Sequence, residues 1–180
     1  MSLSSLSLIA LQILNETADG VVIADRSLDG SPIVFVNAAF ERMTGYASLE
    51  TLGRNCRFLQ GSDRDQPEIA LMGEAIAASG PVAVTLRNYR QDGSMFWNEV
   101  RLAPMKEPGR ADGPPRFYVG FQRDVTDRIE ADYKIWQARR AAEEANSARV
   151  QFFKAMDHEL RTPIGIIAGF AELLITAAER

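Results

Sequence analysis

The sequence predicts an α+β domain built on a five-stranded antiparallel sheet, with helices on one face and a helical extension at each end. Two short β-branched runs precede a helical middle region, and three longer alternating runs follow it. Alternation with a period of two is typical of a strand with one buried face, whereas apolar repeats of three or four residues indicate a helix. Such a layout leaves room for a ligand between helices and sheet.

The first half of the chain is predicted to contain a helix, a hairpin and a mixed region. An apolar stripe predicts an amphipathic helix over residues 1–18, and it comprises Leu3, Leu6, Ala10, Ile13 and Leu14. Strands are expected at 20–25 and 32–37, joined by a turn. Short helical pieces divided by glycines are expected over 38–66, and a longer helix over 68–79 that stops at Gly80-Pro81.

Three strands complete the expected sheet, at 82–90, 95–104 and 116–124. The Asp92-Gly93 turn between the first two is a strong hairpin signal. Together these elements predict a single domain over residues 19–126.

Residues 127–180 are expected to form one long helix, bent at Pro163 because proline removes a backbone donor. Apolar residues spaced by three to five positions resemble a coiled-coil seam with one phase slip near 139–140, and they include Tyr133, Trp136, Phe152, Met156 and Leu160. A helix folded back on the sheet is the alternative.

The composition limits the classes of partner and chemistry. A net charge of -4 gives no overall attraction to nucleic acid or to an anionic membrane, so we expect neither as a partner. No stretch reaches the roughly 20 apolar residues of a membrane span. With one Cys and one His, we expect no metal site and no disulfide within the chain. The expected compartment is the reducing cytoplasm.

The most informative segment surrounds the single cysteine, Cys56. This residue lies between Asn55 and Arg57, with Gln60 one turn later on the same helical face. Further amides lie on three expected strands, at Asn88, Asn98 and Gln122. An amide offers a donor and an acceptor without charge, which suits a heterocycle with alternating carbonyl and N–H groups. A small buried thiol and exposed strand amides remain the alternative interpretation.

Four motifs along the chain, GRNCRFLQG, LRNY, FWNEVRLAP and YVGFQRDVT, resemble the LOV (light, oxygen, voltage) photoreceptor branch of the PAS family. The resemblance extends from Gly20 to Thr126, about three fifths of the chain. It implies a PAS/LOV fold, flavin mononucleotide (FMN) as cofactor and Cys56 as the photoreactive thiol that forms a reversible adduct. It also implies that Gln122 transmits the signal and that Arg57 holds the phosphate. The cofactor-binding residues implied by it are Asn55, Cys56, Arg57, Gln60, Asn88, Asn98, Leu102 and Gln122.

One position departs from the family pattern. A second arginine commonly faces the flavin phosphate from the helix after the cysteine, and Gly73 stands at that position here. Either Arg64 or another residue replaces it, or the affinity for flavin and the preference for the phosphate are weaker.

A second motif, FFKAMDHELRTP at 152–163, resembles the phosphoacceptor helix of sensor histidine kinases. That resemblance implies His158 as phosphoacceptor, Glu159 as the residue that orients it and Thr162 as an aid to dephosphorylation. Only 22 residues follow His158, and no glycine-rich phosphate loop with its lysine is present, so we expect no enzymatic activity from this chain by itself. It is either part of a larger kinase or a short photoreceptor that keeps the helix as an interaction surface.

The sequence therefore predicts a blue-light sensor that signals through a change in helix packing or association. We expect a homodimer through the terminal helices. The alternatives are the sensory part of a light-regulated histidine kinase with a two-component partner, and a light-independent PAS module that senses redox state or a small ligand.

Overall fold

The computed structural model of the chain describes residues 3–107, 109 and 113–178; the side chains of residues 3–7, 155 and 157–178 lie outside this description. The chain divides into two compact units, Met1–Ile129 and Glu130–Arg180, and each is described by itself.

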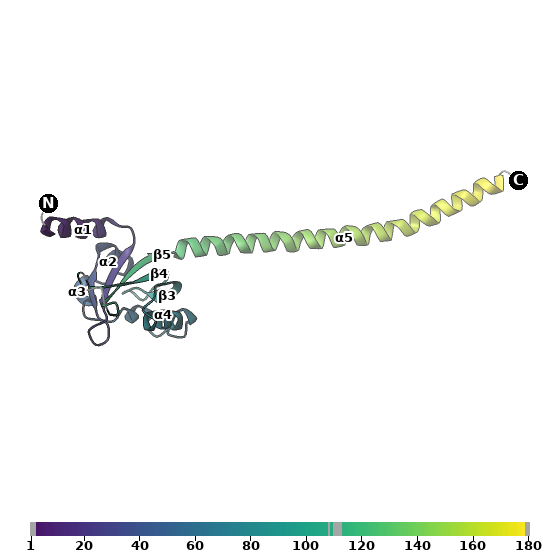
Figure 1. The fold of residues 1–180 in the computed structure, drawn as a ribbon. Helices are drawn as coiled ribbons and strands as arrows, with labels where there is room; N and C mark the ends of the chain where they lie inside the picture. Colours follow the sequence, from purple (N-terminus) through teal and green to yellow (C-terminus); the bar gives the residue numbers. More distant parts are fainter. Residues whose placement is uncertain (1–2, 108, 110–112, 179–180) are drawn as a thin grey trace. The chain divides into compact units, whose positions relative to one another are not determined.

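The first unit has the predicted α+β fold (Figure 1). In chain order, its elements are α1 (Leu3–Glu16), β1 (Gly20–Asp25), β2 (Ile33–Val36), α2 (Ala38–Thr44), α3 (Ser48–Thr51), the 3-10 helix η1 (Cys56–Gln60), α4 (Pro67–Ala77), β3 (Val82–Tyr89), β4 (Met95–Met105) and β5 (Phe117–Asp124). The start of α5 (Thr126–Ala178) completes it. The five strands form one sheet in the order β2-β1-β5-β4-β3, and every neighbouring pair is antiparallel.

The pleat of the sheet separates an inner from an outer face. On β4, Phe96, Asn98 and Val100 are buried, whereas the residues between them are half-buried. The same alternation buries Leu86 and Asn88 on β3. The expected hairpin between these strands is confirmed, and Gly93 at its turn has a φ of +83°, which glycine adopts without steric cost. The inner face therefore carries both apolar residues and amides.

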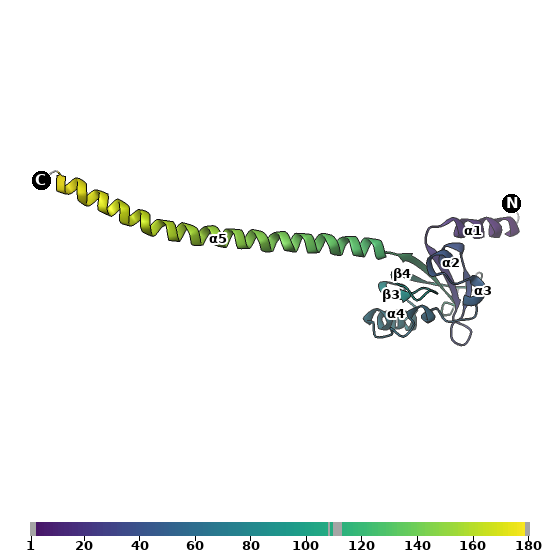
Figure 2. The ribbon, with the colours of Figure 1, turned by 180° about the vertical axis from the view of Figure 1, so that it is seen from behind.

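The helices pack against this sheet and close the core. Helix α2 packs against β1, α4 and η1 pack against β3, and α3 lies near β2 (Figures 1 and 2). One core cluster joins the sheet to α2 and η1 through Val22, Ile33, Val36, Phe40 and Leu59. This cluster fixes η1, which begins at Cys56, relative to the sheet.

Asn37 joins three elements at the start of the fold. Its side-chain oxygen accepts hydrogen bonds from the backbone N–H groups of Val21 (2.8 Å) and Phe40 (2.9 Å), so it caps α2 and holds β1. Its side-chain nitrogen donates to the carbonyl oxygen of Leu14 (2.7 Å) at the end of α1. The N-terminal helix is thereby tied to the domain.

The mixed region divides into short helical pieces as predicted, whereas the next helix ends earlier than predicted. Residues 38–66 divide into α2, α3 and η1, with Cys56 as the first residue of η1. Helix α4 ends at Ala77, two residues before the predicted limit at 79. Ser79 has a φ of +56°, in the left-handed region, and a residue in that conformation cannot continue a right-handed helix.

Helix α5 has 53 residues and continues through Pro163. Tyr133 and Trp136 stack with ring centroids 5.9 Å apart, and Trp136 is 52% exposed. Phe152 and Phe153 are also exposed. In the part of the chain that the structure describes, no helix is long and apolar enough to cross a membrane.

Candidate functional site

A cavity of about 460 Å³ lies between the inner face of the sheet and the helical segments. Its volume lies in the range of roughly 300–1,000 Å³ that is typical of small-molecule sites. The predicted site residues among its walls are Asn55, Cys56, Arg57, Gln60, Asn88, Leu102 and Gln122. The fold thus brings residues from η1 and three strands to one cavity.

The strand amides reach this cavity because of the register of the sheet. Leu86 on β3 faces Asn98 on β4, and Val100 on β4 faces Gln122 on β5. Asn88 lies two residues beyond Leu86, so all three amides lie on the inner face of adjacent strands. Gln122 is only 2% exposed.

Asn98 occupies a different position from the other predicted residues. It is completely buried and is not among the residues that line the cavity. Its side-chain nitrogen donates to Asn88 Oδ1 and to Gln122 Oε1, both at 2.8 Å. Its own Oδ1 has no hydrogen-bond partner among the described residues. A buried amide oxygen without a partner is costly, which favours a ligand with a donor at this place.

The Cys56 thiol lies next to this amide network. Gln122 Nε2 is 3.5 Å from the sulfur and donates a hydrogen bond to it. Burial raises the pKa of Cys56 to about 11, although the Gln122 hydrogen bond acts in the opposite direction. The thiol is therefore protonated at neutral pH and is poorly suited to act as a thiolate nucleophile.

The loop after η1 is held against β3 by side chains that the sequence analysis did not single out. Gln66 accepts from the backbone N–H of Arg87 (2.8 Å) and donates to its carbonyl oxygen (3.1 Å). Asp63 accepts two hydrogen bonds from the Arg87 guanidinium (2.7 and 3.0 Å) and one from the Tyr89 hydroxyl (3.0 Å). The bond from Arg87 lowers the pKa of Asp63 and keeps it ionised. These contacts limit how far η1, and with it Cys56, can move.

Basic residues line the cavity on its loop side. Arg57 lies on η1, Arg64 follows η1, and Arg26 lies between β1 and β2. The sequence analysis did not identify Arg26, because it lies far along the chain from the motifs that indicated the site. Gly73 on α4 also lines the cavity.

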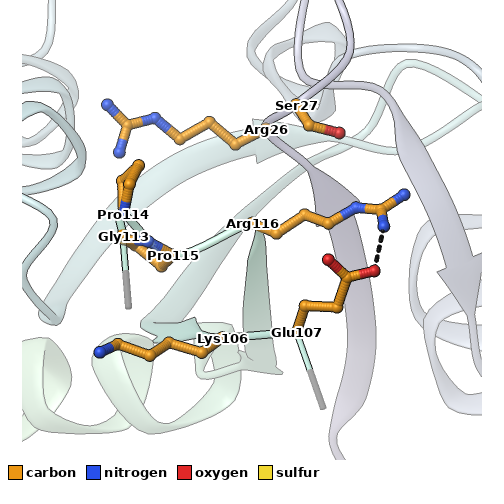
Figure 3. A pocket seen from close by; sticks show the side chains of 8 residues that line it. All are labelled: Arg26, Ser27, Lys106, Glu107, Gly113, Pro114, Pro115 and Arg116. Carbon is orange, nitrogen blue, oxygen red and sulfur yellow. Dashed lines mark hydrogen bonds and ion pairs between the residues drawn. The ribbon is translucent and has the colours of Figure 1, made fainter. Parts of the chain in front are cut away.

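A second cavity of about 340 Å³ lies beside the start of β5 (Figure 3). Arg116 in its wall pairs with Glu107 at 2.6 Å and with the buried Asp25 at 3.0 Å. Its described walls contain neither the cysteine nor any of the predicted amides. It therefore lacks the chemistry that the sequence predicts.

His158 is the predicted phosphoacceptor. It belongs to α5 in the second unit, and its side chain lies outside the described residues. Within the ranges that the structure describes, no group of three or more His, Cys, Asp or Glu side chains could hold a metal ion.

Comparison with known proteins identifies the family. The PAS domain model matches residues 18–127. A blue-light photoreceptor of Listeria monocytogenes is 42% identical over 127 residues, which cover 71% of this chain and 48% of that protein. This chain spans about half the length of the curated relatives it matches first.

Two solved structures are similar in fold and sequence. The LOV domain of a blue-light activated histidine kinase from Erythrobacter litoralis has a TM-score of 0.57 and 40% identity, with 62% of this chain and 99% of that chain covered. An RNA-binding light-oxygen-voltage receptor has a TM-score of 0.69 and 37% identity, with 81% of this chain and 40% of that chain covered.

The raised pKa predicts slow alkylation of Cys56. Since Cys56 is the only cysteine, iodoacetamide labelling followed by mass spectrometry reports on it alone. At pH 8 the native chain should react about a hundredfold more slowly than the urea-unfolded chain, because the thiolate fraction falls tenfold per pKa unit. The native rate should continue to rise tenfold per pH unit up to pH 10. A rate that levels off near pH 9 would contradict the raised pKa.

Proposed function

This chain belongs to the PAS domain family, in its LOV branch, and from that premise we propose that it is a blue-light photoreceptor that binds FMN and uses Cys56 as its photoreactive thiol. The observation that carries the proposal is the 3.5 Å contact between the Cys56 sulfur and the Gln122 amide in the wall of one cavity.

The residues of the cavity fit a flavin ring. The ring presents carbonyl and N–H groups along one edge, and the amides of Asn88, Asn98 and Gln122 offer complementary donors and acceptors. The unpartnered Oδ1 of Asn98 lies behind the residues of the cavity wall, and a ring N–H that reached it would satisfy it. Gly120 also lines the cavity, and a Cβ there would lie 3.1 Å from Leu102 Cδ2. The lack of a side chain at this position leaves room for the ring.

Bound flavin supplies the absorption of blue light and an excited state that accepts a thiol sulfur at a ring carbon and a proton at a ring nitrogen. Cys56 supplies both, because its high pKa keeps the proton on the sulfur in the dark. Its position at the start of η1 is fixed by Asn55, which accepts a hydrogen bond from the Arg57 N–H at 3.0 Å. The core cluster beneath η1 limits its movement further.

Gln122 is the proposed transmitter. Its Oε1 accepts from Asn98 while its Nε2 donates to Cys56. A half-turn of the Gln122 amide exchanges the positions of Oε1 and Nε2. Each hydrogen bond is then lost unless its partner, Asn98 or Cys56, also changes its hydrogen bonding. One mispaired buried group costs about 1–3 kcal/mol, which is enough to shift a two-state equilibrium by one or two orders of magnitude.

Two residues beyond Gln122, Asp124 ends β5 just before the output helix α5. Asp124 Oδ1 accepts from the N–H (2.9 Å) and hydroxyl (2.6 Å) of Thr126, and its Oδ2 accepts from Arg90 at 2.6 Å. Burial raises the pKa of Asp124, but the hydrogen bonds from Arg90 and Thr126 lower it below its usual value. The first turn of α5 is thereby held by an ionised carboxylate next to the transmitter.

We propose that the output is a change in association through α5. Large apolar side chains on this helix, including Tyr133, Trp136, Phe152 and Phe153, are exposed in the single chain. Burying them against a second copy would remove apolar surface from water at about 25 cal/mol per Å². We therefore propose a homodimer that forms through these side chains and whose packing changes with light.

A second candidate function is sensory input to a histidine kinase, with His158 as phosphoacceptor. It is favoured by the HELRTP sequence around His158 and by the similarity to the kinase LOV domain. Incubation with a histidine-kinase catalytic domain and radiolabelled ATP tests it. Label on the full chain but not on His158→Gln would support this function, and equal label on both would exclude it.

The colour of the purified chain tests the photoreceptor proposal. We expect yellow protein that bleaches under blue light and recovers in darkness. Cys56→Ala and Cys56→Ser should keep the flavin but lose reversible bleaching, because neither supplies a sulfur. A colourless wild type would favour a light-independent PAS module, and unchanged bleaching in both variants would remove Cys56 from the chemistry.

Replacing Gln122 by leucine tests the transmitter. Gln122→Leu should bleach like the wild type but show a strongly reduced difference in mass or radius between light and dark, measured by light scattering. Coupling should fall about tenfold, the equivalent of one lost hydrogen bond. Gln60→Leu is the matched control, because Gln60 lines the same cavity without a bond to Asn98. Equal losses in both variants would show a general packing effect.

A further inference from the structure

Three arginines in the wall of the flavin cavity lack an anionic partner. Within the described residues, Arg26, Arg57 and Arg64 form no ion pair with a carboxylate, although Arg87, Arg90, Arg116 and Arg123 each pair with an aspartate. Arg57 and Arg64 donate only to amide or carbonyl oxygens, those of Asn55 and Gly61. Such a set of unneutralised cations around a cavity is a binding surface for an anion.

Gly73 stands where the family pattern has a second arginine, so this position carries no side chain. Gly73 lines the cavity, and a Cβ built there would meet no atom within 4 Å. The helix therefore leaves open space on the side of the cavity where a cation would be useful. A ligand phosphate held by Arg57 would therefore take any second cation from a residue other than Gly73.

Arg26 is the residue best placed to do so. It is half-buried, and its Nη1 donates a hydrogen bond to Ser79 Oγ at 3.1 Å, beyond the end of α4. This contact joins the loop after β1 to the helix that carries Gly73. Figure 3 shows the guanidinium groups of Arg26 and Arg116 pointing in opposite directions, with Glu107 paired to Arg116. The carboxylate of Asp25 also pairs with Arg116.

The hydrogen bond from Arg26 to the Ser79 hydroxyl is weaker than a hydrogen bond from Arg26 to an anion would be. A hydroxyl is neutral, and hydrogen bonds between a guanidinium and an anion are about twice as strong as neutral ones. Arg64 is the competing candidate, but it is exposed, and its hydrogen bond to the Gly61 carbonyl oxygen is long at 3.4 Å. Holding a flexible exposed side chain on an anion costs more conformational entropy.

We propose that Arg26 binds the ligand phosphate in place of the arginine that Gly73 lacks, and exchanges its bond to Ser79 for one to the phosphate. This inference rests on the proposed flavin function. It makes the cavity selective for flavin mononucleotide over riboflavin, which has the same ring but no phosphate.

The test is a titration of the flavin-depleted full chain with FMN and with riboflavin, followed by flavin fluorescence in darkness. The wild type should bind FMN more tightly. Arg26→Gln should weaken FMN binding about tenfold and leave riboflavin binding unchanged, because only FMN carries the anion. Arg26→Lys should keep part of the preference, since it retains the charge but not the planar donor pair.

Gly73→Arg gives the rescue. Introduced beside Arg26→Gln, it should restore FMN affinity because it places a cation in the open space on α4. Gly73→Ala is its control, since it raises helix propensity without adding charge.

Four results would overturn the inference. Equal weakening for FMN and riboflavin in Arg26→Gln would show a structural role, and no weakening would exclude Arg26. A selective loss in Arg64→Gln with none in Arg26→Gln would assign the phosphate to Arg64. A wild type that binds both flavins equally would also overturn it while the proposed function stands, whereas one that binds neither flavin would end the proposed function itself.

Discussion

The antiparallel register of β3, β4 and β5 is the constraint on which the cavity depends. Since side chains alternate between the faces of a strand, Asn88, Asn98 and Gln122 reach one face only when their strands pair as they do. A slip of one residue in any strand would turn its amide outward and an outer residue such as Trp97 inward. The apolar partners of the amides on the same face, among them Phe96 and Leu86, make such a slip costly. The packing of the core therefore determines which side chains face the cavity, in addition to stabilising the domain.

Charged and uncharged side chains lie on different sides of the cavity. The strands contribute uncharged amides and a protonated thiol faces them, because an unpaired charge in that enclosed region would carry a large desolvation cost. The arginines come from η1 and the loops, where water can reach them. A ligand with a neutral polar ring and a charged tail matches this division, whereas a compact anion would satisfy only the loop side. The raised pKa of Cys56 belongs to the same pattern.

The sheet and the terminal helices could be predicted because their signals are local. Alternation along 82–90 and 95–104, and the Asp92-Gly93 turn between them, place two of the three amides, Asn88 and Asn98, on strands without knowledge of any distant contact. The remaining features depend on partners far apart in sequence. Arg26 meets Ser79 across 53 positions, and nothing in either segment alone announces the pairing. The burial of Asn98 behind its neighbours, rather than in the cavity wall, likewise arises from packing across three strands. The early end of α4 follows from the backbone of Ser79, a residue type that seldom adopts a positive φ.

The route from the cavity to α5 is short because both ends lie on β5. Asn98 pairs in register with Asp124, so the strand that carries the buried amide also faces the residue that caps the helix. The backbone N–H of Val125 donates to the Trp97 carbonyl oxygen (2.9 Å), and the Trp97 N–H donates to Thr126 Oγ1 (2.9 Å), so β4 holds the junction on both sides. A rearrangement of the Gln122 amide that disturbs Asn98 therefore acts on the strand that fastens the first turn of α5. No movement of the whole sheet is needed, since one residue separates Gln122 from Asp124 on β5.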